Sequence, residues 1–154
     1  IVPAAKALQA MNLAFMWHIV GDGSERARVE MLITENALKD YVILEGSKTN
    51  PYPYMKYADL FVHPSYIESQ GLTVLEAMTL GVPCVVTKSR GPCEFIKDGV
   101  NGLLTEQSPE SLTEKVLSIL TDKTLYQSIK ENTVCPEQFG PDRVMKQIEE
   151  LIDG

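Results

Sequence analysis

The chain has 154 residues, of which 44% are hydrophobic, so it can bury one sizeable core and we expect a single domain over residues 1–154. A formal net charge of −7 argues against nucleic acid and an anionic membrane surface as direct partners. No apolar run reaches the roughly 20 residues of a membrane span, and no signal-peptide pattern opens the chain. Three cysteines at no metal-like spacing indicate a reducing compartment, so we expect a cytoplasmic protein.

Apolar spacing and turn residues predict alternating helices and strands. We expect strands at 15–20, 42–44, 59–63, 83–87 and 102–104. Helices are expected at 4–14, 24–38, 55–57 and 72–80, briefly from residue 94, at 112–120 after a cap at residue 108, at 122–131, and from residue 139 onward. This alternation predicts an α/β fold, a Rossmann-like three-layer domain in which a parallel sheet carries helices on both faces.

The first strand is followed by a glycine turn that contains Gly21 and Gly23. A third glycine of the dinucleotide fingerprint is missing, which argues against an NAD site. Exposed backbone N–H groups in such a turn can approach a phosphate, but a turn that needs positive φ explains the glycines equally well.

The most informative stretch is 68–76, where Glu68 and Glu76 flank a glycine turn and the start of an apolar helix. A carboxylate beside packed apolar surface needs hydrogen-bond donors, because burying it unpaired costs several kcal/mol. Sugar or ribose hydroxyls, backbone N–H groups and basic side chains can all supply them. The alternative is a pair of solvated glutamates with no ligand.

Other candidate groups have plain structural explanations. Tyr52 lies in a loop of prolines and tyrosines that could wall a flat base by stacking, or could simply cover the core. His18 and His63 have no triad or metal partner at a recognisable spacing, so we expect packed strand residues. Cys84, flanked by valines, is expected in the core. Lys88 and Arg90 are read as solvated loop charges, and no metal site is expected.

A known family shares an ordered set of these residues. The chain resembles the donor-binding half of retaining GT-B glycosyltransferases of group 1 (GT4-like), which include sucrose, glycogen and bacterial polysaccharide synthases. The resemblance runs from about residue 20 to the C-terminus and rests on these blocks: His63-Pro64-Ser65, Glu68, Glu76-Ala77-Met78, Gly81-Val82-Pro83, Glu94 and the turn 98–104.

The resemblance implies transfer of a hexosyl group from a nucleotide-diphosphate sugar, a UDP-sugar first of all, to a saccharide or lipid-linked acceptor in polysaccharide or glycoconjugate biosynthesis, with no cofactor. It places Glu68 in the catalytic centre, on hydroxyls of the transferred sugar, and Glu76 on the ribose hydroxyls. The backbone N–H groups of the helix start would hold sugar and phosphate oxygens, the glycine turn would approach the diphosphate, and the tyrosine loop would lie beside the base. The implied donor-binding residues are Gly21, Gly23, Tyr52, Ser69, Gln70, Gly71, Leu72, Thr73 and Glu76. Ser69 and Gln70 replace the Gly-Phe common in the family, which leaves the donor sugar open.

Ile1 stands where a start methionine would be, so we expect a piece of a longer protein that could lie at the inner face of a membrane. The family's first strand of this domain, with the Arg and Lys that neutralise the leaving diphosphate, is not in the sequence, nor is the acceptor domain. We therefore expect this chain to bind nucleotide weakly and not to turn over. Two alternatives remain: half of a nucleotide-sugar epimerase, and a non-catalytic nucleotide-binding module.

Overall fold

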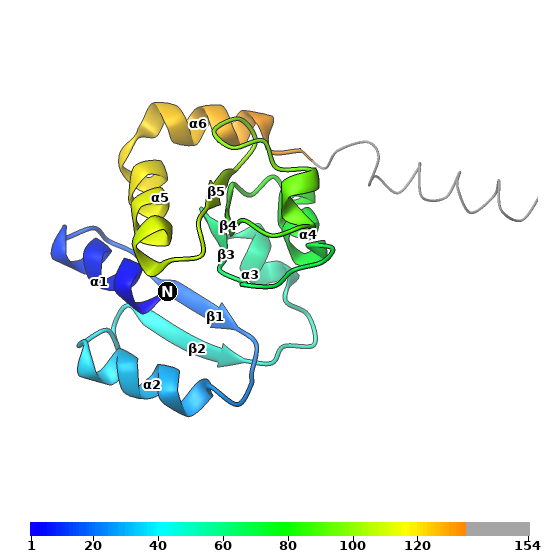
Figure 1. Cartoon of the computed structure of the whole chain (residues 1–154). Helices are drawn as coiled ribbons and strands as arrows, with labels where there is room; N and C mark the ends of the chain where they lie inside the picture. The colour runs from blue at the N-terminus through cyan, green and yellow to red at the C-terminus, as the bar shows by residue number, and fades with distance from the viewer. Residues whose placement is uncertain (135–154) are drawn as a thin grey trace, which may run out of the picture.

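The structure is a computed structural model that describes residues 1–134 (Figure 1). Its helices are α1 (Val2–Ala10), α2 (Arg26–Glu35), α3 (Tyr52–Lys56), α4 (Leu72–Thr79), the 3-10 turn η1 (Pro92–Glu94), α5 (Pro109–Thr121) and α6 (Lys123–Asn132). The strands are β1 (Trp17–Val20), β2 (Val42–Gly46), β3 (Phe61–His63), β4 (Cys84–Thr87) and β5 (Leu103–Thr105). The helix expected from residue 139 lies outside the described residues.

The five strands are all parallel to their neighbours, as the alternation of helices and strands predicts. Together with the helices around them they confirm the Rossmann-like α/β fold. The strands nevertheless form two hydrogen-bonded sheets, β1-β2 and β3-β4-β5, where the sequence predicts one. The reason is that β1 and β3 do not pair with each other, and Figure 1 draws β1-β2 apart from the three other strands.

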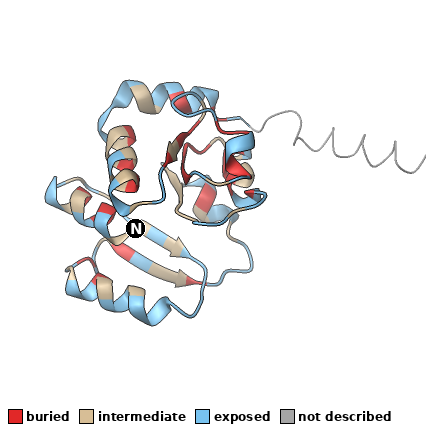
Figure 2. Ribbon diagram, in the orientation of Figure 1, coloured by how far each residue is buried: buried red, intermediate tan, exposed pale blue. Residues whose placement is uncertain are grey.

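The most deeply buried strand is β4, in which all four residues are buried (Figure 2). One apolar cluster packs α4 against one face of β4, and a second packs α5 and α6 against the other face through Val85. Cys84 is fully buried, as expected, and this burial raises the pKa of its thiol to about 12. A thiol with such a pKa stays protonated and is a poor nucleophile.

Several element ends differ from the expected ones for local reasons. The first helix stops at Ala10 rather than residue 14, because Asn12 takes a left-handed conformation with φ of 52°. Glu94 closes the short 3-10 turn rather than opening it. The start of α5 is as predicted, since Ser108 Oγ accepts a hydrogen bond from the N–H of Ser111. No helix within residues 1–134 has the length and apolar character that crossing a membrane requires.

A polar cluster around Glu45 fastens α3 to the first sheet. The Glu45 carboxylate lies 2.9 Å from His18 Nδ1 on β1, 2.9 Å from Lys48 Nζ and 2.9 Å from the Tyr54 hydroxyl of α3. Hydrogen bonds from these three groups lower the pKa of Glu45 to about 2, and the bond from Lys48 has the largest effect. His18 is therefore not the packed strand residue that the sequence predicts; its ring is exposed and contacts Glu45.

The lowered pKa of Glu45 predicts an acid-sensitive attachment of α3. Stability from this carboxylate is complete above its ordinary pKa near 4.5 and is lost as the pH falls toward about 2, because protonation removes the charge that the three donors hold. Melting temperatures of Glu45→Gln and the parent should differ most above pH 4.5 and converge near pH 2. The matched control is Glu114→Gln on the exposed face of α5, which should follow the parent throughout. A gap between Glu45→Gln and the parent that is constant with pH would contradict this assignment.

Candidate functional site

The candidate site is the loop that leaves β3 and enters α4 through Gly71. Gly71 caps α4 in a left-handed conformation, φ 73°, which only glycine adopts without strain. The turn brings the chain back over the end of β3, so that a carboxylate in the loop reaches the N–H groups at the start of the helix. Ligands of parallel α/β sheets bind at this edge, beyond the carboxyl ends of the strands.

Glu68 is held by the backbone of its own loop. Its Oε1 accepts hydrogen bonds from the N–H of Gln70 at 3.1 Å and of Gly71 at 2.9 Å. These two bonds lower the pKa of Glu68, and the bond from Gly71 has the larger effect. The carboxylate is therefore ionised at neutral pH. The family resemblance assigns both N–H groups to sugar or phosphate oxygens of the donor, whereas in the structure they donate to Glu68.

His63 faces the other oxygen of the same carboxylate. Its Nε2 lies 3.4 Å from Glu68 Oε2, is buried, and makes no hydrogen bond of good geometry to any described residue. The ring of Phe61 stacks on it with centroids 6.2 Å apart. His63 is thus a strand residue, as predicted, but sequence spacing gave no sign of its carboxylate partner, which lies five positions away across a turn.

Glu76 and Tyr52, singled out separately in the sequence, lie together. The Tyr52 hydroxyl on α3 donates a hydrogen bond to Glu76 Oε1 on α4 at 3.2 Å, and this contact raises the pKa of Tyr52. Glu76 is half-buried, whereas Tyr52 is about half exposed. The contact joins α3, which follows β2 of the first sheet, to α4, which follows β3 of the second sheet.

The first turn of α4 leaves two of its N–H groups open. The N–H groups of Val74 and Leu75 return to the carbonyl of Gly71, whereas those of Leu72 and Thr73 have no partner within residues 1–134. Both residues are exposed. Together with the helix dipole these two donors can meet an anionic oxygen.

The Glu68 loop rests on a second segment, around Gly91, to which the sequence gave no role in the site. Gly91 is buried against the backbone of Gln70, where an added Cβ would lie 2.5 Å from the Gln70 carbonyl carbon. Its N–H donates to the carbonyl of Glu68 at 3.2 Å. Gly71 in turn has Phe95 and Pro92 at 3.0 and 3.1 Å from the place of a Cβ. The two segments can approach this closely only because Gly91 and Gly71 have no side chains. In the sequence, the glycines are the only sign of this close approach.

The remaining predicted residues are exposed. Gly21 bridges to Gly46 with an N–H to carbonyl distance of 2.9 Å, and the N–H of Gly23 bonds to Asp22 Oδ1. No hydrogen bond joins this glycine turn to the Glu68 loop within the described part of the chain. Ser69 is exposed beside Gln70.

The cations near the site are mostly engaged elsewhere. Lys88 pairs with Glu106, and Lys6 Nζ bonds to Asn36 Oδ1 at the far end of α2. Arg90 is exposed and has no carboxylate within ion-pair distance in residues 1–134. Its guanidinium is therefore available to an anionic ligand.

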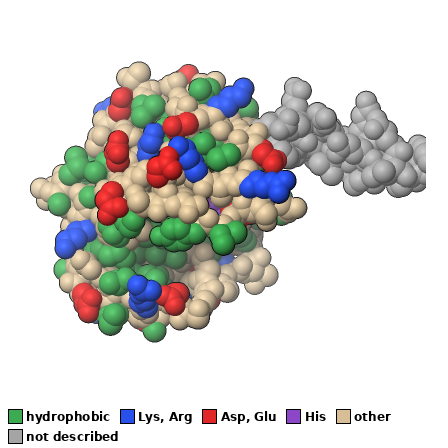
Figure 3. Space-filling view, in the orientation of Figure 1, with side chains coloured by type: hydrophobic (Ala, Val, Ile, Leu, Met, Phe, Trp, Pro, Cys, Tyr) green, Lys and Arg blue, Asp and Glu red, His purple; other side chains and the backbone are tan. Residues whose placement is uncertain are grey.

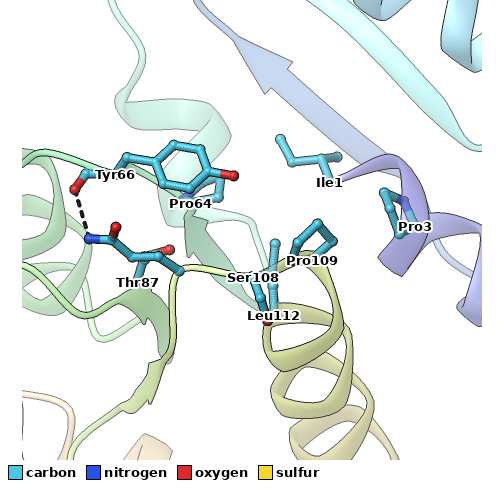
Figure 4. A pocket seen from close by; sticks show the side chains of 9 residues that line it. Ile1, Pro3, Pro64, Tyr66, Thr87, Ser108, Pro109 and Leu112 are labelled. Atoms are coloured by element: carbon cyan, nitrogen blue, oxygen red, sulfur yellow. Dashed lines mark hydrogen bonds between the residues drawn. The ribbon is translucent and has the colours of Figure 1, made fainter.

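A pocket of about 170 Å³ lies beside the site (Figure 4). Ile1 and Pro3 at the start of α1 face Pro64 and Tyr66, which follow β3, and Thr87 and the start of α5 complete it. The Tyr66 carbonyl accepts a hydrogen bond from Gln107 Nε2 at 2.9 Å. Neither Glu68 nor Glu76 lines this pocket, so it is not a hollow between the two carboxylates.

The close approach of Gly91 to Gln70 predicts that Gly91→Ala moves the loop. The added methyl cannot fit beside backbone atoms at 2.5 to 2.8 Å, so we expect a loss of roughly 1–3 kcal/mol in the free energy of unfolding. The amide signals of Gln70 and Gly71 should shift in the nitrogen–proton NMR spectrum. Gly23→Ala is the control, because a Cβ there meets nothing within 4 Å. Unchanged Gln70 and Gly71 signals in Gly91→Ala would show that Gly91 does not support the loop.

Several known proteins are similar in sequence to this chain over most of its length. N-acetyl-alpha-D-glucosaminyl L-malate synthase of Bacillus anthracis is 31% identical over 136 residues, which are 86% of this chain and 36% of that protein. Poly(ribitol-phosphate) alpha-N-acetylglucosaminyltransferase of Staphylococcus aureus is 30% identical over 153 residues, 96% of this chain and 31% of that protein. The chain thus spans about a third of the length of the curated relatives it matches.

Solved structures share the fold. Anabaena HepE in complex with UDP superposes with a TM-score of 0.84 at 25% identity, covering 97% of this chain and 44% of HepE. Sucrose-phosphate synthase of Thermosynechococcus elongatus gives a TM-score of 0.83 at 26% identity, covering 99% of this chain and 41% of that protein.

The family model of glycosyl transferases group 1 matches residues 1–134. This match covers most of the chain and confirms the resemblance that the motif blocks indicate. The chain belongs to the glycosyl transferases group 1 family.

Proposed function

We propose that this chain is the donor-binding part of a glycosyltransferase that moves a hexosyl group from a nucleotide-diphosphate sugar to a saccharide or lipid-linked acceptor. The single observation that carries the proposal is the arrangement at α4: an ionised Glu68 at its start, two open N–H groups on its first turn, and Glu76 one turn further along. The acceptor-binding domain lies outside this sequence.

UDP is the first nucleotide to test. Anabaena HepE, which shares the fold at 25% identity, has been solved with UDP and with UDP-glucose, and TarM of S. aureus, at 26% identity, with UDP. The net charge of −7 requires that a diphosphate be bound by local donors. The N–H groups of Leu72 and Thr73 and the exposed guanidinium of Arg90 are such donors.

Each group binds the part of the donor that suits its charge: N–H donors bind the anionic diphosphate, and carboxylates bind the neutral hydroxyls. The start of α4 stabilises the leaving diphosphate, because its N–H groups and dipole face the negative charge that grows as the glycosidic bond breaks. Glu76 accepts hydrogen bonds from ribose hydroxyls. Glu68 accepts from hydroxyls of the transferred sugar and is kept ionised by the backbone while doing so. The roles of Gly21 and Gly23 at the diphosphate and of Ser69 and Gln70 at the sugar are part of the same proposal.

Tyr52 competes with the nucleotide for Glu76. Its hydroxyl donates to Glu76 Oε1, so a ribose hydroxyl that bonds to the same lone pair of this oxygen displaces it. Its ring, half exposed on α3, then covers the base. The tyrosine hydroxyl supplies the half-buried Glu76 carboxylate with a hydrogen-bond donor, which lowers the free-energy cost of burying its charge.

We also propose a cytoplasmic location. The support is that the two cysteines in the described part of the chain, Cys84 and Cys93, are free thiols.

Calorimetric titration of the chain with UDP, GDP and ADP tests the proposal. We expect weak binding that favours UDP and no sugar transfer, because residues 1–154 span only about a third of the length of relatives such as the N-acetylglucosaminyltransferase of S. aureus. Heat from none of the three nucleotides, with the fold intact by circular dichroism, would overturn it. Sugar transfer to an added acceptor is the readout for the longer protein, and its absence alongside intact nucleotide binding would favour a non-catalytic module.

Glu76→Gln should weaken UDP binding about tenfold, because a neutral amide accepts ribose hydrogen bonds less strongly than a carboxylate. The control Glu114→Gln on α5 should bind as the parent does. Equal affinity of Glu76→Gln and the parent would remove Glu76 from the nucleotide site.

Tyr52→Phe should tighten UDP binding roughly fivefold, since it removes a competing hydrogen bond worth about 1 kcal/mol and keeps the ring. Tyr52→Ala should weaken binding, because the stacking surface is lost. Tyr57→Phe, at an exposed tyrosine at the end of α3, is the control. Weaker binding by Tyr52→Phe would mean that the hydroxyl contacts the nucleotide instead of competing with it.

A further inference from the structure

The two oxygens of the Glu68 carboxylate have different surroundings. Oε1 accepts hydrogen bonds from the N–H groups of Gln70 and Gly71, at 3.1 and 2.9 Å. A carboxylate oxygen has two lone pairs, so these two donors use both lone pairs of Oε1. Oε2 is the oxygen that is left for other donors. Its neighbour in the structure is Nε2 of His63, at 3.4 Å.

Nε2 of His63 is a buried polar atom without a hydrogen bond of good geometry to any of residues 1–134. Burying such an atom without a partner costs free energy, so its position needs a physical reason. The distance of 3.4 Å to Glu68 Oε2 is about half an ångström longer than an ordinary hydrogen bond between nitrogen and oxygen. Hydrogen bonds in active sites are often long before the ligand binds and tighten when it does. A small movement therefore completes a hydrogen bond between the two side chains.

The imidazole ring of His63 is held by its strand. His63 is the last residue of β3 and lies in register with Val86 of the fully buried β4. Phe61, two residues earlier and so on the same face of β3, stacks on the ring. Only 20% of the histidine side chain is exposed. The atom that moves is therefore Glu68 Oε2, because the carboxylate can turn about Oε1 while it keeps its two backbone donors.

His63 is the basic side chain that can donate to this oxygen. No other basic side chain of residues 1–134 lies within ion-pair distance of Glu68. Lys88, on the loop after β4, pairs with Glu106 after β5. Figure 3 shows acidic and basic side chains close together over the region where Figure 1 draws β5 and α5, and the charges there pair among themselves.

The charge of Glu68 determines which nitrogen of the ring carries the proton. The N–H groups of Gly71 and Gln70 lower the pKa of Glu68, so its carboxylate is ionised and only accepts hydrogen bonds. A neutral imidazole carries one proton, on Nδ1 or on Nε2. With the proton on Nδ1, the lone pair of Nε2 would face the negatively charged Oε2, which is electrostatically unfavourable. The arrangement therefore favours the form of His63 that is protonated on Nε2.

We propose that His63 is a positioning residue of the site: it donates its Nε2 proton to Glu68 Oε2 and so leaves this oxygen one lone pair, which accepts a hydroxyl of the transferred sugar. The inference rests on the proposed function in that Glu68 binds the sugar. Two donors on Oε1 and one on Oε2 fix the plane of the carboxylate, and with it the direction of the remaining lone pair. His63 therefore acts on the sugar part of the donor and not on the nucleotide, whose ribose is assigned to Glu76.

The protonation of His63 can be measured without any ligand. Long-range nitrogen–proton NMR of the chain of residues 1–154 distinguishes the protonated from the unprotonated nitrogen of a neutral imidazole. We expect the neutral ring of His63 to carry its proton on Nε2 in the parent. In Glu68→Gln it should become a mixture of both forms, because an amide can donate as well as accept. A proton on Nδ1 in the parent, or a population of the Nε2 form that Glu68→Gln leaves unchanged, would overturn the proposal.

The effect on the donor is measured by titration with UDP, UDP-glucose, UDP-galactose and UDP-N-acetylglucosamine, as the affinity for each UDP-sugar relative to UDP. His63→Leu removes the donor and keeps a side chain of similar bulk. It should lower this ratio roughly fivefold for the UDP-sugar that the parent prefers, because a hydrogen bond to a charged group is lost. His63→Gln should recover most of the loss, since its amide nitrogen can donate in place of Nε2. His18→Leu, at the exposed histidine of β1, is the matched control and should keep the ratio of the parent.

The outcomes separate His63 from the proposed function. Equal losses for UDP and the UDP-sugar in His63→Leu, or no recovery in His63→Gln, would make His63 a structural residue and overturn the proposal. A parent that binds UDP but no UDP-sugar differently from UDP would contradict the assignment of Glu68 to the sugar, which belongs to the proposed function. The protonation of the His63 ring still decides in that case whether His63 positions Glu68, because that measurement uses no nucleotide.

Discussion

The candidate site depends on one contact, the Glu68 carboxylate bound by the N–H groups of Gln70 and Gly71. An ionised carboxylate at the start of a helix is favoured by the helix dipole, and two backbone donors fix its position. Gly71 makes the contact possible, since its left-handed conformation turns the chain so that donor and acceptor meet within three residues. The same turn leaves the N–H groups of Leu72 and Thr73 without a partner within residues 1–134.

The contact of Glu68 with the two N–H groups depends on neighbouring segments that hold the loop in place. Gly91 and Pro92 fill the space behind the loop, and Phe95 and Pro92 approach Gly71 closely from one side. His63, fixed on β3 next to the fully buried β4, brings a ring nitrogen to the free oxygen of Glu68. Each support comes from a different segment, so the loop is positioned by the sheet and not by its own sequence alone.

Local sequence signals were sufficient to predict the helices and strands and many of the residues of the candidate site. The left-handed glycine before α4, the glycine after it at residue 81 and the serine cap of α5 are signals contained in a few neighbouring residues, and all three appear in the structure. The contacts of His18 and Glu45, or of Gly91 and Gln70, join residues about 20 or more positions apart, and no periodicity reports them. Tyr52 and Glu76 were found separately for this reason, and only the fold shows that they touch. The alternation of helices and strands predicted a single sheet because it carries no information on whether β1 and β3 pair with each other, and in the structure they do not.

The two sheets and the candidate site are physically linked through α3. Tyr52 is carried by α3, which Glu45 fastens to β1 and β2, whereas Glu76 is carried by α4, which packs on β4. The distance between the tyrosine and the glutamate therefore depends on how the first sheet sits beside the second. Trp17 of β1 and Val62 of β3 pack into one apolar cluster with Leu8 of α1 and residues of α5, and this packing helps to hold the two sheets, and with them the two halves of the site, beside each other.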